Sequence, residues 1–262
     1  MIRGLRTYGP ALISRWCAPR RFVILTTGRT GSELLASLLD SHPRIVCAGE
    51  LLKEGRTFPT QYVEARAGMA GLRGMEAYGW KLLLSQYRNP SGTVRGIGDP
   101  DTYPARLDAM GYRLILLARR NLVAQAMSSI RAEQTQFHHY RGDRTAFTPT
   151  EVDPVTLMAF TWVREAETTA LIETIGAVPY LRLTYEDDLL DPACHQDTVD
   201  RVCRYLGMDS APVSSGLVKV APRGVREMVT NFEEVMELFR DTRYAGYLED
   251  DGKPASTQLD QS

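Results

Sequence analysis

Five short, mainly apolar segments, separated by stretches with helical spacing, constrain the fold of this chain more than any other feature. The segments are residues 22–26, 45–47, 79–84, 112–118 and 178–183. Apolar runs of this length indicate strands that are buried on both faces. Because helical segments separate the strands, the pattern predicts an α/β fold. We expect a P-loop-like three-layer sandwich with a central parallel sheet flanked by helices.

The helical segments carry recognisable start and stop signals. They cover about residues 34–41, 121–132, 154–175, 191–206 and 231–240. Asp153 is the expected N-cap of the third helix, with Pro154 in its first turn, and Gly176 ends it. Ligands of parallel sheets bind beyond the carboxyl ends of the strands. We therefore expect functional residues directly after the first, second and fourth strands.

Length and charge limit the kind of protein further. The 262 residues suit one domain, and the net charge of −1 gives no general attraction to nucleic acid. We expect a basic lead-in at 1–20 that is able to contact anionic lipid, a domain at 21–249 and a disordered tail at 250–262. No apolar run approaches the ~20 residues that span a bilayer. The four cysteines lack metal or CxxC spacing, which favours a reducing, cytoplasmic location.

The loop after the first strand has the composition of an anion-binding turn. It consists of Thr27, Gly28, Arg29, Thr30, Gly31, Ser32 and Glu33. The glycines let the backbone curl, so that N–H groups and a helix N-terminus converge, and Arg29 adds planar cationic donors. A nucleoside-triphosphate P-loop would need a lysine between Gly31 and Ser32, and a dinucleotide loop would need a third glycine. An ordinary strand-to-helix turn is the alternative interpretation.

A second basic segment follows the fourth strand. Arg119 and Arg120 end the strand, and Ser128 lies eight residues after Arg120, about two helical turns along the next helix. Arginines at a strand end need an anion or carboxylate partner, so an exposed helix start with surface ion pairs is the alternative. Two anion grips at adjacent strand ends suit a ligand that carries two separated phosphates.

These motifs resemble the PAPS-dependent sulfotransferase superfamily, where PAPS is 3′-phosphoadenosine 5′-phosphosulfate. The first loop is similar to its 5′-phosphosulfate loop, and the Arg120–Ser128 spacing is similar to its 3′-phosphate motif. The segment Tyr185-Glu-Asp-Asp-Leu-Leu190 resembles an element of carbohydrate sulfotransferases. His42-Pro43 followed by Gly49-Glu50-Leu51-Leu52 looks closest to the nodulation-factor type. The chain departs from the superfamily pattern at Thr27-Gly28, Glu33 and Asn121-Leu122.

The resemblance implies a role for several residues. Glu50 is the expected general base, with Glu54 as a near alternative, and Arg29 is expected to stabilise the leaving group, with Lys81 as a second candidate. Arg223-Gly224 resembles a late basic loop over the 3′-phosphate, with an ordinary turn as the alternative. The tract at 134–144 resembles the region that shapes the acceptor pocket. The implied co-substrate is PAPS, the implied product is PAP, and no metal is expected.

Two other classes of function remain open at this point. One is a P-loop kinase or NTPase-like enzyme, against which the missing Gly-Lys-[Ser/Thr] counts. The other is a non-catalytic relative that binds a nucleotide or a glycan. The implied acceptor of the favoured function is a hydroxyl group of a carbohydrate or glycolipid.

Overall fold

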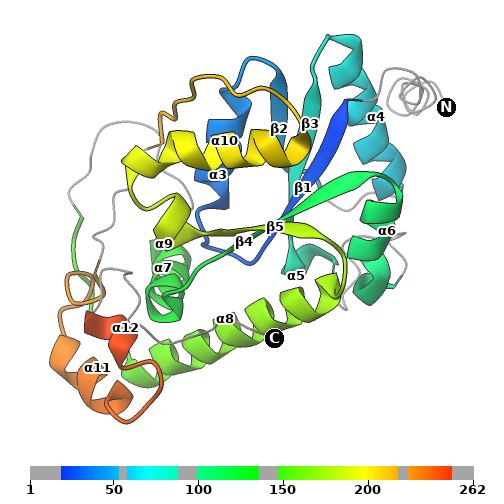
Figure 1. Ribbon diagram of the computed structural model, residues 1–262. Helices are drawn as coiled ribbons and strands as arrows, with labels where there is room; N and C mark the ends of the chain where they lie inside the picture. Colours follow the sequence, from blue (N-terminus) through cyan, green and yellow to red (C-terminus); the bar gives the residue numbers. More distant parts are fainter. Residues whose placement is uncertain (1–18, 53–57, 88–98, 136–146, 218–223, 250–262) are drawn as a thin grey trace. The chain divides into compact units, whose positions relative to one another are not determined.

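The computed structural model describes residues 19–52, 58–87, 99–135, 147–217 and 224–249 (Figure 1). The chain divides into two compact units. The first comprises Met1–Ala118 and Glu167–Ser215, and the second comprises Arg119–Ala166 and Gly216–Ser262. The predicted lead-in at 1–20, except for its last two residues, and the predicted tail at 250–262 lie outside the described residues.

The first unit contains one five-stranded parallel sheet, which confirms the predicted fold class. Its strands are β1 (Arg20–Thr26), β2 (Ile45–Glu50), β3 (Ala77–Leu83), β4 (Tyr112–Ala118) and β5 (Tyr180–Thr184). They are arranged in the order β2-β3-β1-β4-β5, and all neighbouring pairs are parallel. All five predicted strands are present. β2 and β3 lie on one side of the central strand β1, and the later strands β4 and β5 lie on its other side. The strand order therefore reverses at β1.

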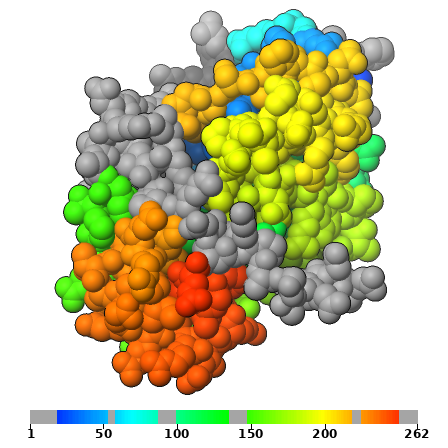
Figure 2. Space-filling view, turned by 60° about the vertical axis from the view of Figure 1, so that its left-hand side comes forward, coloured from blue at the N-terminus to red at the C-terminus, as the bar shows by residue number. Residues whose placement is uncertain are grey.

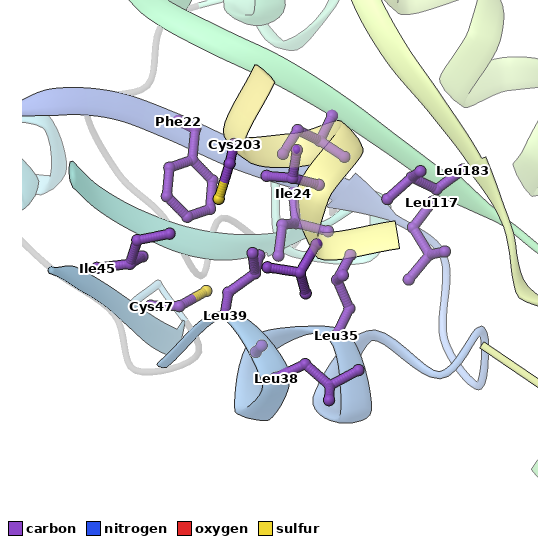
Figure 3. Close-up of a cluster of buried hydrophobic side chains, with 14 of the residues drawn as sticks. Phe22, Ile24, Leu35, Leu38, Leu39, Ile45, Cys47, Leu117, Leu183 and Cys203 are labelled. Carbon is purple, nitrogen blue, oxygen red and sulfur yellow. The ribbon is translucent and has the colours of Figure 1, made fainter. Parts of the chain in front are cut away.

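Helices cover both faces of this sheet, and β1 shows why. Val23 and Leu25 pack into one apolar cluster, and Phe22 and Ile24 pack into another, because successive strand residues point to opposite faces. The first cluster lies under α4 (Pro59–Leu72), α6 (Tyr103–Ala109) and the last turns of α8 (Pro154–Ile175). The second lies under α3 (Ser32–Asp40) and α10 (His195–Leu206), and Figure 3 shows its side chains.

Two cysteines belong to the second cluster. Cys47 and Cys203 are buried and free (Figure 3). Burial raises the pKa of both thiols, because an apolar environment disfavours the thiolate. The outer surface of α10 is the yellow region of Figure 2, where its exposed side chains lie. These cysteines therefore act as small apolar core residues.

A buried carboxylate ties β5 to α10. Asp188 ends the short helix α9 (Tyr185–Asp188), which follows β5, and α10 begins after the 3-10 turn η2 (Pro192–Cys194). The Asp188 carboxylate accepts a hydrogen bond from the Thr184 backbone N–H at 2.6 Å and forms an ion pair with Arg201. Thr198 donates its hydroxyl proton to the Asp188 carbonyl at 2.8 Å. Asp188, an acidic residue of the Tyr185–Leu190 motif, therefore stabilises the fold by joining β5 to α10.

The second unit is helical and has its own apolar core. It contains α7 (Leu122–Thr135), the first part of α8, α11 (Phe232–Phe239) and α12 (Gly246–Glu249). The core includes Val123, Met127, Leu157, Val235 and Phe239. Asp153 caps α8 as predicted, and hydrogen bonds from Thr156 lower the pKa of its carboxyl. Asn121 caps α7 by accepting from the Ala124 N–H at 2.8 Å, and its amide donates to the Tyr247 carbonyl at 2.9 Å.

The structure adds helices that the sequence analysis did not predict. They are α4, α5 (Leu84–Tyr87), η1 (Pro100–Thr102), α6, α9 and α12. The buried side of α4 is built largely from Ala65, Ala67, Gly68 and Ala70. Small residues let this helix lie close to the sheet, but they leave no leucine or isoleucine periodicity for a sequence pattern to show.

Candidate functional site

The candidate site lies at the carboxyl edge of the sheet, beside its central strand. Because the strand order reverses at β1, the segments that follow β1 and its neighbours are the expected place for a ligand. β1 ends at Thr26, β2 at Glu50 and β3 at Leu83. All three ends belong to the first unit, so their contacts can be described together.

The loop after β1 turns sharply through two residues in the left-handed region. Arg29 has a φ of 66° and Gly31 a φ of 81°. Gly31 is also the N-cap of α3, where no side chain makes a cap hydrogen bond. The first turn of α3 therefore presents its backbone N–H groups and the positive end of its dipole at the loop. A non-glycine residue with positive φ is the kind of local strain that concentrates at functional sites.

Tyr185 holds this loop from the outside. A Cβ atom added at Gly31 would lie 2.5 Å from Cδ2 of Tyr185, closer than such atoms approach. Glycine is thus required here both for its backbone angle and for the contact with the tyrosine ring. The tyrosine of the Tyr185–Leu190 motif supports the loop by packing, although it lies far away in the sequence.

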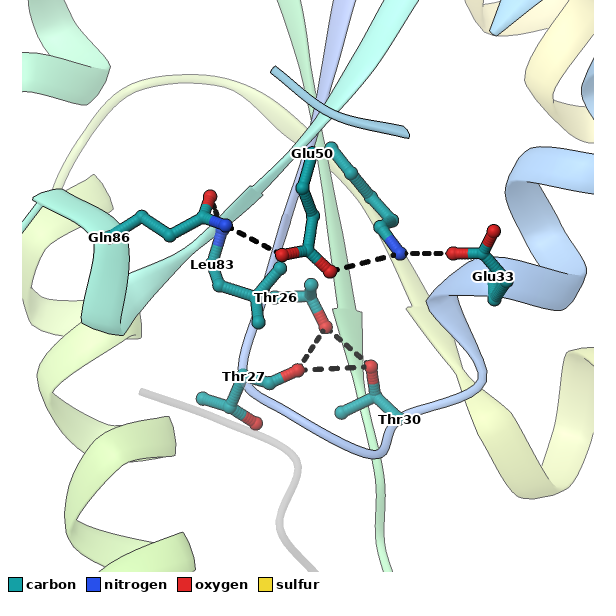
Figure 4. Close-up of polar contacts among 8 residues, drawn as sticks. Thr26, Thr27, Thr30, Glu33, Glu50, Leu83 and Gln86 are labelled. Carbon is teal, nitrogen blue, oxygen red and sulfur yellow. Dashed lines mark hydrogen bonds and ion pairs between the residues drawn. The ribbon is translucent and has the colours of Figure 1, made fainter. Parts of the chain in front are cut away.

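Buried threonine hydroxyls brace the base of the loop (Figure 4). Thr26 Oγ1 donates to the Leu117 carbonyl of β4 at 2.8 Å and lies 2.5 Å from Thr30 Oγ1. Since Thr26 has one hydroxyl proton, Thr30 donates to it in this arrangement. Both side chains are fully buried. Thr30 therefore supports the loop through its buried contact with Thr26.

A buried lysine links the loop helix to the end of β2. Lys81 of β3 is only 2% exposed, and its Nζ lies 2.5 Å from Glu33 Oε2 and 3.4 Å from Glu50 Oε1 (Figure 4). The second oxygen of Glu50, Oε2, accepts a hydrogen bond from Gln86 Nε2 at 2.7 Å. A buried ammonium needs carboxylate partners, and here two elements supply one each. Two carboxylates share one cation, so the group keeps one negative charge in excess.

A β-bulge brings Glu50 into this group. In β2, Ile45 and Cys47 belong to the cluster on the α3 face, whereas Val46 and Ala48 pack against the opposite cluster. Strict alternation would place Glu50 with Ala48. The register shifts between these two residues, so that Ala48 pairs with Trp80 but Glu50 pairs with Lys81. The extra residue re-aims Glu50 toward Lys81, a common use of bulges near active sites.

The structure brings together most of the predicted site residues. Thr27, Gly28, Arg29, Thr30, Gly31, Ser32, Glu33, Glu50 and Lys81 all belong to the first unit, on the loop and strands just described. Arg119, Arg120, Ser128 and Gly224 belong to the second unit. Arg223, Glu54 and positions 136–144 of the predicted acceptor tract lie outside the described residues.

Two features of the site were not predicted from the sequence. One is the residue Gln86, and the other is the packing of Tyr185 against Gly31. Gln86 lies on α5, three residues beyond the end of β3. The strand pattern placed the expected functional residues after strands one, two and four, but β3 is a direct neighbour of β1. Including the segment after the third strand would have found Gln86, because that segment also ends at the ligand edge.

The described part of the chain contains neither a cluster of metal ligands nor a helix suited to crossing a membrane. No group of three or more His, Cys, Asp and Glu side chains among these residues is arranged to hold a metal ion. No described helix has both the length and the apolar character that crossing a membrane requires.

Several known proteins are similar to this chain. No family model matches the chain. It is 26% identical over 242 residues to nodulation protein H of Rhizobium meliloti, which covers 88% of this chain and 96% of that protein. Nodulation protein H of Rhizobium tropici is 26% identical over 252 residues, with 91% and 96% covered. The relatives bear out the resemblance that the motifs indicated, since the chain is similar to nodulation protein H over most of its length. Its named relatives are the nodulation protein H proteins of rhizobia.

Two solved structures are also similar. A sulfotransferase from Alicyclobacillus acidocaldarius is 15% identical, with a TM-score of 0.46 over 88% of this chain and 94% of that one. The sulfotransferase domain of the Synechococcus PCC 7002 olefin synthase is 16% identical, with a TM-score of 0.40 over 94% and 90%. The α/β fold class is assigned from the parallel five-stranded sheet of this chain itself.

The contact between Gly31 and Tyr185 predicts a specific effect of substitution. Gly31→Ala should lower the free energy of unfolding by about 2–4 kcal/mol, since it adds a clash to the penalty for positive φ. Gly74→Ala is the matched control, because Gly74 also has positive φ (79°) but open space around its Cβ position. It should cost only about 1–2 kcal/mol. Urea unfolding measures both, and equal losses would contradict the assigned role of the Tyr185 contact.

The shared cation predicts non-additive stability changes. Glu33→Gln and Glu50→Gln should each cost about 1 kcal/mol, because Lys81 keeps one carboxylate in either variant. The double variant should cost about 1–2 kcal/mol more than the sum, since a buried ammonium then lacks a carboxylate among the described residues. Adding Lys81→Met to the double variant should recover most of that excess. Strictly additive changes in the free energy of unfolding, measured with urea, would show that the three charges are not coupled.

Proposed function

We propose that this chain is a sulfotransferase that moves the sulfuryl group of PAPS to a hydroxyl of a carbohydrate or glycolipid acceptor and releases PAP. The observation that carries the proposal is the placement of Glu50 beside the loop after β1, joined to it through Lys81 and Glu33. An anion-type loop and a partly exposed carboxylate at one sheet edge are the two parts that sulfuryl transfer needs. The kinship with nodulation protein H supports the same function.

The loop is the proposed site of the 5′-phosphosulfate. The backbone N–H groups at the start of α3 and the guanidinium of Arg29 are donors suited to phosphate and sulfate oxygens. On the sequence motif alone, Arg120 and Ser128 of the second unit are assigned to the 3′-phosphate, with Arg223 and Gly224 as further candidates. The donor is a co-substrate, and the proposed reaction requires no metal.

Glu50 is the proposed general base. The acceptor oxygen attacks sulfur, the bond from sulfur to the bridging oxygen of the donor breaks, and the acceptor proton passes to the Glu50 carboxylate. Electrostatic stabilisation of the departing phosphate oxygen falls to Arg29. Lys81 was the second candidate for that role. Its contacts with Glu33 and Glu50 favour the interpretation that it holds the base and the loop helix in place.

PAP should bind this protein much more strongly than ATP with magnesium. A ligand at 100 times its Kd stabilises the folded state by about 2.7 kcal/mol, which thermal shift detects readily. We therefore expect a clear rise in Tm with PAP and little change with ATP and magnesium. An equal response to the two nucleotides would favour a kinase or NTPase-like enzyme. PAP binding without transfer to any glycan of a broad panel would favour a non-catalytic relative.

Glu50→Gln should retain PAP affinity and lose most turnover. A general base contributes about 10²- to 10⁴-fold to the rate, and this substitution removes the proton acceptor without changing the size of the side chain. Turnover is measured as PAP formed from PAPS with a panel of oligosaccharide acceptors. Glu173→Gln, an exposed change on α8, is the control and should behave like the original protein. Retained turnover in Glu50→Gln would place the base elsewhere.

A further inference from the structure

Gln86 makes two hydrogen bonds that define its orientation. Its Oε1 accepts from the Leu83 backbone N–H at 3.2 Å, and its Nε2 donates to Glu50 Oε2 at 2.7 Å (Figure 4). A backbone N–H can only donate, so it must face the amide oxygen. The amide nitrogen is then directed at Glu50. The assignment of the two amide ends therefore follows from the hydrogen-bond network, which is the proper basis for it.

This bond completes the hold on Glu50. Lys81 lies beside Oε1 at 3.4 Å, and Gln86 donates to Oε2. The last torsion of a glutamate side chain is normally broad, because it joins an sp³ and an sp² carbon. With a partner on each oxygen, the plane of this carboxylate is fixed. A carboxylate has about four lone-pair sites, so sites remain that can accept a proton from a hydroxyl.

The choice of an amide suits this role. Gln86 is neutral and therefore orients the carboxylate without adding a second cation beside it. A second cation would make the carboxylate a poorer acceptor of a proton. Lys81 already supplies the positive charge, which it divides between Glu33 and Glu50. The two partners of Glu50 thus have separate roles. Lys81 provides a positive charge beside Oε1, and Gln86 orients the carboxylate through its hydrogen bond to Oε2.

We propose that Gln86 is a positioning residue for sulfuryl transfer, which fixes the Glu50 carboxylate so that a free lone pair faces the acceptor hydroxyl. The inference rests on the proposed role of Glu50 as the base. In this role Gln86 acts through Glu50 and needs no contact with donor or acceptor. Its effect should therefore appear in kcat and vanish when Glu50 can no longer take a proton.

The first test uses Gln86→Met, which keeps the approximate size of the side chain and removes both amide groups. We expect kcat to fall about 10- to 100-fold, the range that loss of one hydrogen bond to a charged group produces. The Kd for PAP should stay within about twofold, and the urea midpoint should fall modestly, because two partly buried hydrogen bonds are lost. Gln61→Met, an exposed glutamine on α4, is the control and should leave kcat unchanged. An unchanged kcat in Gln86→Met would overturn the proposal.

The second test is a double-mutant cycle with Glu50→Gln. If Gln86 acts through the base, Gln86→Met should lower the residual kcat of Glu50→Gln less than about twofold. A full loss in that background would overturn the proposal, because Gln86 would then act independently. Full turnover in Glu50→Gln alone would instead refute the proposed base. The two failures are thus distinguishable.

A second variant covers the case in which Gln86→Met does not fold. Gln86→Glu keeps the size of the side chain and an oxygen for the Leu83 N–H, and it replaces only the donor that faces Glu50. It should lose at least as much kcat as the methionine variant and show the same loss of effect with Glu50→Gln. A folded Gln86→Glu protein with full kcat would also overturn the proposal.

Discussion

One buried ammonium organises the candidate site. Lys81 is almost wholly removed from solvent, and an unpaired charge in that position would destabilise the fold strongly. The chain supplies Glu33 from α3 and Glu50 from β2, so three separate elements meet at one cation. The same pairing that stabilises the fold thereby sets where the proposed base lies relative to the loop after β1. The stability of the fold and the proposed chemistry therefore depend on the same electrostatic contact.

The loop itself has its shape set by more than its own glycines. Arg29 adopts a positive φ, which a residue with a side chain adopts only when its surroundings impose it. Thr26 and Thr30 brace the base of the loop, and Tyr185 packs against Gly31 from another part of the chain. The result is a set of backbone donors held in place for the proposed anion. Such preorganisation is what makes electrostatic stabilisation effective in catalysis.

Sequence patterns predicted the sheet well and the helices unevenly. All five strands were recognisable because buried parallel strands are short and apolar throughout. Helix α4 was not, because its buried side consists largely of alanine and glycine, which carry no apolar periodicity. Within the site, Glu33, Glu50 and Lys81 were candidates from the sequence, but their mutual contact was not. Gln86 escaped notice because the segment after the third strand was not considered, although β3 lies directly beside β1.

The sequence by itself determined the fold class and carried the resemblance to a superfamily, since strand–helix alternation and motif spacing are local properties. The tertiary structure decided which side chains meet. Whether Glu50 faces α3 or the opposite layer depends on a bulge in β2, and a shift of one residue reverses the face of a strand side chain. Gly49 is compatible with a bulge but does not require one. Only the pairing of β2 with β3 brings Glu50 to Lys81, because register is a property of two strands together.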